Sequence, residues 1–345
     1  MSRIDKYTPR KVARGPDGEI LKTSAMIASI AAEGQKTAPG PFGAALTELA
    51  ARNERIVGLT ADLSKYTDLH VFARAHPDRF YQMGMAEAVL MSAAAGLARE
   101  GFQPWATTYA VFASRRAYDF ICMAIAEENL DVKIVCALPG LTTGYGPSHQ
   151  ATEDLAIFRG LPNMTIIDPC DAEDIRQIVP AIAAHRGPVY MRLLRGNVPL
   201  VLDEYGYTFE LGKAKMIRDG RDVLIVSTGL MTMRALEAAK ALEADRIDVG
   251  VLHVPTIKPL DAETIRQEAA KTGRMVVVAE NHTIVGGLGE AVAGVLMRAN
   301  VRPPAFHQIA LPDEFLDAGA LPTLHDRYGI STAAVAARIR AWLGE

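Results

Sequence analysis

The sequence has few cysteines, little net charge and no long apolar run. Its three cysteines, Cys122, Cys136 and Cys170, lie far apart without the spacing of metal ligands, so we expect reduced thiols. A formal net charge of −3 gives no basic surface for nucleic acid or for an anionic membrane. No apolar run approaches the ~20 residues of a membrane span, and no secretory signal is recognisable near residue 1. These absences predict a cytoplasmic protein without a membrane or nucleic-acid partner.

Strand-like and helix-like segments alternate from residue 41 onward. The 345 residues are 49% apolar and 22% charged, a globular composition in a chain longer than one ordinary core. The alternation is typical of an α/β fold, in which helices cover both faces of a parallel sheet. The expected strands are 55–63, 103–109, 132–138, 164–169 and 189–194, and the expected helices are 41–53, 86–100, 112–128, 152–161 and 171–185.

The alternation breaks at 196–212, and a second alternating unit follows. Its expected strands are 222–229, 248–261 and 275–281, and its expected helices are 231–244, 286–299 and 332–343. We therefore expect two doubly wound α/β domains. The predicted boundaries are an N-terminal extension at 1–36 with a helix-like stretch at 22–35, a first domain at 37–200, a linker at 201–212 and a second domain at 213–345.

One carboxylate, Glu87, lies in an otherwise apolar stretch, "YQMGMAEAVLMSAAAGLA" (81–98). In the first turn of a helix, a negative side chain is stabilised by about 0.3–1 kcal/mol at the positive end of the helix dipole. Alternatively, Glu87 is a desolvated acid with a chemical task, because burial favours its protonated form. These residues alone slightly favour the first interpretation.

Two further segments place polar or aromatic side chains at the ends of expected strands. The run "GYGPSHQ" (144–150) cannot continue a helix or a strand, so His149 stands on a loop at an edge where open α/β sheets bind ligands. A histidine there is a candidate for acid–base or oxyanion chemistry, although for this histidine alone a solvent or structural role is favoured. Tyr109 and Phe112 lie at a similar corner, either as core residues or as an aromatic face for a flat ring.

Taken together and in order, five segments resemble the C-terminal half of a transketolase, from about residue 41 to the end of the chain. They are "ALTELAARNERIVGLTADLSKYT" (45–67), "DRFYQMGMAEAVLMSAAAGLAREG" (78–101), "TTYAVFASRRAYDF" (107–120), "GPSHQATEDLAIFRGLPNMTIIDPCDAED" (146–174) and "AENHTIVGGLGEAV" (279–292). The pattern is that of a split transketolase. There, a pyrimidine-binding domain with a parallel sheet and a smaller C-terminal domain with a mixed sheet form a separate polypeptide.

The resemblance implies a shared cofactor and a partner. The family's diphosphate-binding domain carries a metal-binding Gly-Asp-Gly motif, and this sequence has no equivalent. Thiamine diphosphate would therefore be shared with an N-terminal transketolase subunit, which would also bind Mg²⁺ or Ca²⁺. We expect an α2β2 assembly and no metal ligand in this chain.

The family's cofactor-binding residues match positions of this sequence. The glutamate at the position of Glu87 bonds ring nitrogen N1′ of the cofactor, and a neutral acid there favours the imino tautomer that takes the proton from thiazolium C2. By the same resemblance, Phe112 stacks on the aminopyrimidine with Tyr109 beside it. Asp62 and Leu63 would line the cofactor pocket.

The substrate end matches the family only in part. His149 matches a histidine near the substrate carbonyl, and Arg195 matches an arginine that holds the sugar phosphate. Where the family has an arginine, a serine, a histidine and an aspartate, this sequence has Pro39, Tyr66, Ala137 and Tyr145. The first three family residues help to bind phosphate, so the phosphate-binding end is altered here. Tyr66 and Tyr145 would instead face the substrate.

The leading prediction is an enzyme subunit that transfers a two-carbon ketol unit from a ketose to an aldehyde. One alternative is the β subunit of a 2-oxoacid dehydrogenase, against which the "GPSHQATED" loop argues. Another is a deoxyxylulose-phosphate-synthase-like enzyme, although those are typically single long chains. A non-catalytic interaction subunit is a third, but a scaffold would need none of Glu87, Phe112 and His149.

Overall fold

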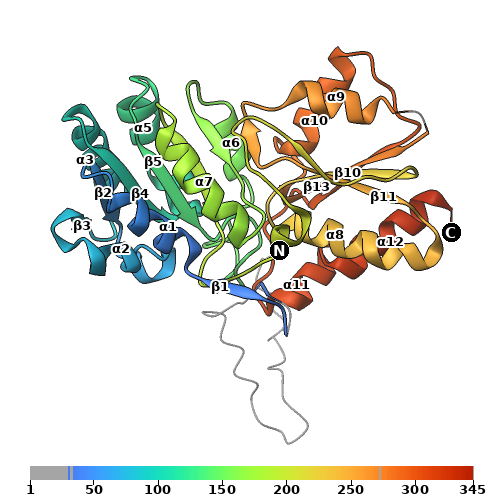
Figure 1. The fold of residues 1–345 in the computed structure, drawn as a ribbon, viewed down its shortest axis with the longest axis horizontal. Coiled ribbons are helices and arrows are strands. Elements are labelled where there is room, and N and C mark those ends of the chain that lie inside the picture. Colours follow the sequence, from blue (N-terminus) through green and yellow to red (C-terminus); the bar gives the residue numbers. More distant parts are fainter. Residues whose placement is uncertain (1–29, 32–33, 272, 345) are drawn as a thin grey trace, which may run out of the picture.

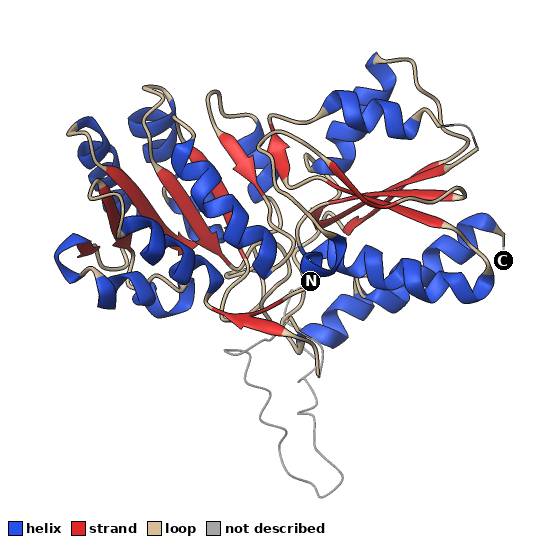
Figure 2. Cartoon of the chain, viewed as in Figure 1, coloured by secondary structure: helices blue, strands red, loops and turns tan. Residues whose placement is uncertain are grey.

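Two sheets of unequal size, each covered by helices, form the molecule (Figures 1 and 2). The computed structural model describes residues 30–31, 34–271 and 273–344, so the helix expected at 22–35 falls mostly outside the described residues. Within these ranges the larger sheet has seven strands and the smaller has five. The expected fold class, two α/β domains of which the second is smaller and mixed, is confirmed.

The larger sheet is parallel except at one edge. Its strands, in order across the sheet, are β12 (Thr256–Lys258), β6 (Thr165–Ile167), β7 (Val189–Leu193), β5 (Lys133–Ala137), β4 (Gln103–Tyr109), β2 (Ile56–Thr60) and β3 (Phe80–Gln82). Since parallel strands end at the same edge, the residues that follow β2, β3, β4, β5 and β7 gather on one side of the sheet.

Continuous apolar runs explain the central strands. Every residue of β2, β4, β5 and β7 is buried. Because successive side chains of a strand point to opposite faces, both faces of this sheet must be covered. Helix α1 contacts α2 and α7, whereas α3 contacts α4 and α5, and α4 contacts α6. These two groups of helices supply the covering layers.

The helices of the first domain agree broadly with the expected segments. They are α1 (Pro41–Ala50), α2 (His70–Ala75), α3 (Glu87–Arg99), α4 (Ala110–Arg116), α5 (Tyr118–Ile121), α6 (Asp154–Arg159) and α7 (Ala172–Ala184), with 3-10 turns at Ser64–Thr67, Pro77–Arg79 and Leu202–Tyr205. The single helix expected at 112–128 is interrupted at Ala117, and α5 continues as a π-helical turn, Cys122–Ala126.

The smaller sheet is mixed, because β9 runs antiparallel to β11. Its strands, in order, are β14 (Phe306–Leu311), β13 (Met275–Thr283), β10 (Val223–Ser227), β11 (Val249–His253) and β9 (Lys215–Arg218). Its helices are α8 (Leu230–Leu242), α9 (Ala262–Ala269), α10 (Leu288–Arg298), α11 (Leu321–Arg327) and α12 (Thr332–Leu343), with a 3-10 turn at Glu243–Asp245. Helices α9 and α10 lie on one side of the sheet, and α8 and α12 on the other (Figure 1). No helix in the described ranges is long and apolar enough to span a membrane.

Short strands connect the domains in a way that the sequence pattern does not indicate. The strand expected at 248–261 is in fact two strands, and the second of them, β12, pairs antiparallel with β6 of the larger sheet. In addition, β1 (Thr37–Pro39) pairs with β8 (Asn197–Pro199), which ties the start of the first domain to the chain just beyond β7. The predicted domain boundaries remain predictions.

A fully buried ion pair in the first domain also contacts the second domain through its arginine. Arg192, in β7, is 1% exposed and donates from Nε (2.9 Å) and Nη2 to the two carboxylate oxygens of Asp154, the first residue of α6. Its Nη1 also donates to Asp168 and, at 3.2 Å, to the backbone carbonyl of Asn281 in β13. Burial alone would raise the pKa of Asp154, but Arg192 and the Tyr190 hydroxyl hold it below its ordinary value. Asp154 is therefore ionised as well as buried.

We expect Arg192→Leu to lower the free energy of unfolding by about 3–5 kcal/mol, because it leaves a buried carboxylate without its partner. Urea unfolding at fixed protein concentration measures the change. Arg99→Leu is the matched control, since Arg99 pairs with Glu128 where both side chains are about half exposed, and its loss should stay within about 1 kcal/mol. Equal losses in the two variants would contradict the importance of the buried pair.

Candidate functional site

The residues singled out from the sequence gather at the carboxyl edge of the larger sheet. Strands β3, β2, β4, β5 and β7 run parallel, so the segments that follow them open on the same side. These segments carry Asp62, Leu63, Tyr66, Glu87, Tyr109, Phe112, Tyr145, His149 and Arg195.

Glu87 is the first residue of α3 and is nevertheless buried, with 4% of its surface exposed. Both interpretations of the sequence therefore describe it: it lies at the positive end of a helix, and it is desolvated. Arg116 donates from Nη1 to Glu87 Oε1 at 3.5 Å. Within the described residues this is the one hydrogen bond to the carboxylate, so the carboxylate has capacity for a further donor or acceptor.

Phe112 and Tyr109 form an aromatic corner where β4 meets α4. Tyr109 is the last residue of β4 and the N-cap of α4. The centroids of the two rings are 5.7 Å apart. The guanidinium carbon of Arg116, at the end of α4, lies 4.0 Å from the Phe112 ring centroid, within the range of a cation–π contact. Arg116 thus bridges the acid and the aromatic ring.

His149 joins this corner from the loop after β5. Its ring centroid lies 5.4 Å from that of Phe112 and 6.0 Å from that of Tyr109, and both contacts are edge-on. Tyr145 packs against His149, and the centroids of these two rings are 5.1 Å apart. Ser148 Oγ lies 2.9 Å from His149 Nδ1, which leaves Nε2 as the nitrogen available to a ligand.

The second domain holds this loop in place. Leu141 donates its backbone N–H to the Asn281 side chain at 2.9 Å, and its carbonyl lies 2.8 Å from His325 Nε2. The backbone N–H of Gly319 donates to the carbonyl of Gly144 at 2.9 Å. Glycine is required at 144, because a Cβ there would lie 2.0 Å from the Gly319 carbonyl oxygen. The position of His149 thus depends on contacts between the domains.

Arg195 and Tyr66 lie at the same edge, close enough to Tyr109 to act on its phenol. The guanidinium of Arg195, just beyond β7, lies 5.7 Å from the Tyr66 ring centroid. Its Nε is buried and has no hydrogen-bond partner among the described residues. At the end of β2, Asp62 adopts a left-handed backbone (φ 59°) and exchanges hydrogen bonds with the Gln82 side chain. Leu63 follows it and is half-buried.

Electrostatics separate the ionisable groups of the site. Burial lowers the pKa of His149, and the positive charge of Arg116 lowers it further. Burial raises the pKa of the Tyr109 phenol. At neutral pH the site therefore combines a neutral imidazole and a neutral phenol with the cations Arg116 and Arg195.

Two family models match the chain. "Transketolase, pyrimidine binding domain" matches residues 39–201, and "Transketolase, C-terminal domain" matches residues 212–335. A putative uncharacterized transketolase family protein of Sinorhizobium fredii is 75% identical over 344 residues, which is 99% of this chain and 100% of that protein. The chain belongs to the transketolase family.

Other transketolase relatives are separate chains of similar extent. A solved structure described as "Split gene transketolase, inactive beta4 tetramer" superposes with a TM-score of 0.79 at 42% identity, covering 88% of this chain and 96% of that chain. The 6-deoxy-6-sulfo-D-fructose transketolase subunit of a Clostridium species is 39% identical over 287 residues, 83% of this chain and 88% of that subunit. The expected resemblance to the C-terminal half of a split transketolase is confirmed.

Three positions at which this transketolase chain departs from the family pattern, Pro39, Tyr66 and Ala137, differ in their surroundings. Ala137, the last residue of β5, is completely buried. Pro39 lies in β1 and pairs with Asn197. Tyr66 lies beneath Arg195 and so belongs to the site. Sequence reasoning missed Arg116, and the only available signal was a basic pair in "ASRRAY" near the start of the helix expected at 112–128.

We expect the pKa of His149 to lie below 6.5 and to rise in Arg116→Gln, because removing a nearby positive charge favours the imidazolium. It should remain below 6.5 in the variant, since burial persists. NMR titration of the imidazole protons measures both values. Arg99→Gln, on the far end of α3, is the control and should leave the pKa unchanged. An equal pKa in the wild type and in Arg116→Gln would contradict the assigned cause.

Proposed function

We propose that the chain is the C-terminal subunit of a split transketolase, which transfers a two-carbon ketol unit from a ketose donor to an aldehyde acceptor. The observation that carries the proposal is the buried acid Glu87 beside the half-buried ring of Phe112, with His149 in contact with that ring. A scaffold would not need a desolvated carboxylate at an open sheet edge, since burying an ionisable group is costly.

The residues fit the pyrimidine half of thiamine diphosphate. The Glu87 carboxylate has hydrogen-bonding capacity to spare, and Phe112 offers an aromatic face. When bound, the cofactor supplies a nucleophilic carbon that adds to the ketone carbonyl. Arg116 covers one face of Phe112, so a ring stacked on that face requires the guanidinium to move. Its side chain is 56% exposed, which leaves it free to do so.

Each residue then has a distinct task. Glu87 would hold or give a proton at a nitrogen of the pyrimidine ring. His149, neutral at pH 7, hydrogen-bonds substrate oxygen atoms near the reacting carbonyl through Nε2. Tyr109 keeps its phenol proton and packs beside Phe112, and Asp62 and Leu63 line the cofactor pocket.

A partner chain completes the site. Among the described residues, no group of three or more His, Cys, Asp or Glu is placed to bind a metal ion. We assign the diphosphate end and its Mg²⁺ or Ca²⁺ to an N-terminal subunit. The description of one relative as a split gene transketolase, inactive as a beta4 tetramer, supports this division and supports self-association within an α2β2 assembly.

The substrate end favours a donor without phosphate. Of the four positions at which the family handles phosphate, only Arg195 supplies a charge, while Pro39, Tyr66 and Ala137 supply none. The 6-deoxy-6-sulfo-D-fructose transketolase subunit of a Clostridium species is named for a sugar with a carbon-bound sulfonate, which is a monoanion. A single arginine can hold such a group bidentately. We therefore propose a ketose with a monoanionic or uncharged end.

We expect the isolated chain to be inactive and Glu87→Gln to abolish turnover of the reconstituted complex, because an amide cannot give up or take the proton. Phe112→Ala should instead raise the concentration of thiamine diphosphate needed for half-maximal rate, since stacking binds the ring. Steady-state assays of ketol transfer with the co-purified N-terminal subunit measure both effects.

Glu128→Gln, on an exposed surface, is the control for Glu87→Gln and should keep full activity. Retention of more than about a tenth of wild-type kcat by Glu87→Gln, a loss in the barrier below about 1.4 kcal/mol, would contradict the role of Glu87. Full turnover by the isolated chain would contradict the shared site.

We expect kcat/KM of the complex to be higher for an unphosphorylated or sulfonated ketose than for its phosphorylated counterpart. Each lost charge-assisted hydrogen bond weakens phosphate binding by about 1.5–3 kcal/mol, so two or three losses amount to orders of magnitude. Rates with xylulose 5-phosphate and xylulose test this. A preference of about a hundredfold or more for the phosphate would show that the partner supplies replacement cations.

A further inference from the structure

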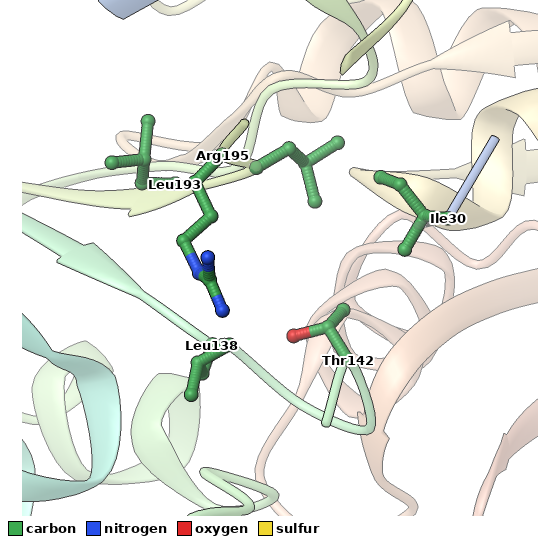
Figure 3. Close-up of a pocket in the computed structure, with 6 residues that line it drawn as sticks. Ile30, Leu138, Thr142, Leu193 and Arg195 are labelled. Atoms are coloured by element: carbon green, nitrogen blue, oxygen red, sulfur yellow. The ribbon is translucent and has the colours of Figure 1, made fainter. Parts of the chain in front are cut away.

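Ile30 lies at the substrate end of the site. A cavity of about 20 Å³ lies there and is lined by Ile30, Leu138, Thr142, Leu193, Leu194 and Arg195 (Figure 3). In Figure 3 the Arg195 guanidinium points into the space between Leu138 and Thr142, and Ile30 faces it from the opposite side. A cavity of this volume has room for about one water molecule.

Backbone hydrogen bonds anchor residues 36–40 to the chain just beyond Arg195. The backbone N–H of Gly40 donates to the Gly196 carbonyl at 2.8 Å, and that of Leu200 donates to the Lys36 carbonyl at 2.9 Å. Between these bonds, β1 pairs with β8. Ile30 itself is partly buried and packed against the core.

The chemistry of this cavity is unsuited to a dianion. Four of its lining side chains are aliphatic, and Arg195 supplies its one charge within the described residues, with Nε still lacking a partner. An apolar wall cannot replace the water around a second negative charge. A phosphate ester is also one atom longer than a sulfonate bound directly to carbon, because of its ester oxygen. The cavity beyond Arg195 has room for about one water molecule and Ile30 lines it, so that extra length would meet Ile30.

We propose that Ile30 is a specificity-determining residue, which closes the substrate site beyond Arg195 and limits the length of the donor's terminal group. The proposal rests on the proposed ketol transfer and goes beyond it, since it assigns a substrate contact to the extension that precedes the first domain. Arg195 selects one negative charge, and Ile30 selects a short terminal group.

The test compares two donors on the reconstituted complex, 6-deoxy-6-sulfofructose and fructose 6-phosphate. The variants Ile30→Val and Ile30→Ala shorten the wall stepwise, and Ile30→Leu keeps its volume. We expect Ile30→Ala to raise the ratio of kcat/KM for the phosphate over the sulfonate by about tenfold or more, the scale of one or more methylene groups in a specificity pocket. Ile30→Val should give a smaller rise in this ratio, and it replaces Ile30→Ala in the test if Ile30→Ala does not fold.

Ile284→Ala is the matched control, because Ile284 is 44% exposed on the second domain. It and Ile30→Leu should change the ratio by less than about twofold. A purely structural role for Ile30 would lower kcat/KM for both donors by the same factor and leave the ratio unchanged, and that result would overturn the proposal. Absence of ketol transfer by the wild-type complex with every donor would instead overturn the proposed function, and the role of Ile30 with it.

Discussion

The buried pair of Arg192 and Asp154 is the constraint on which the site depends. Burying two ions is tolerated only when both are fully hydrogen-bonded, so their geometry is closely specified. Asp154 begins α6 directly after the loop that carries His149. Arg192 lies in β7, three residues before Arg195. The same guanidinium donates to the Asn281 carbonyl in the second domain. One side chain therefore sets the position of the loop, of strand β7, which ends two residues before Arg195, and of the neighbouring domain.

This arrangement explains why the second domain accompanies the first although none of the proposed site residues lies in it. Gly140, in a left-handed conformation, passes so close to Asn281 that a Cβ would lie 2.1 Å from its carbonyl oxygen. Gln150 follows His149 directly in the sequence, and its Nε2 donates to the backbone carbonyl of Asp317 at 3.0 Å. The loop after β5 has few regular hydrogen bonds of its own. The second domain supplies the partners that buried backbone groups require.

Much of the fold could be predicted from the sequence, because buried parallel strands are continuous apolar runs and the expected strands at 103–109 and 189–194 agree with β4 and β7 within one residue. The strand β12 could not, since its pairing with β6 joins segments about 90 residues apart and three residues show no period. The residues of the site were found from the order of five motifs rather than from any one of them. Arg116 was missed because its partner Glu87 lies 29 residues away on another helix, a contact that no local spacing encodes.

The position of Arg116 also reconciles the two interpretations of Glu87. A desolvated carboxylate without a partner would be costly. Arg116 offsets that cost with an ion pair that is long, at 3.5 Å, and exposed on the side of the arginine. Such a pair contributes little to stability and separates easily, since an exposed cation regains its hydration. Glu87 is thus stabilised by a neighbour that a better hydrogen-bonding ligand can displace, whereas Arg192 and Asp154 cannot part without exposing buried charge.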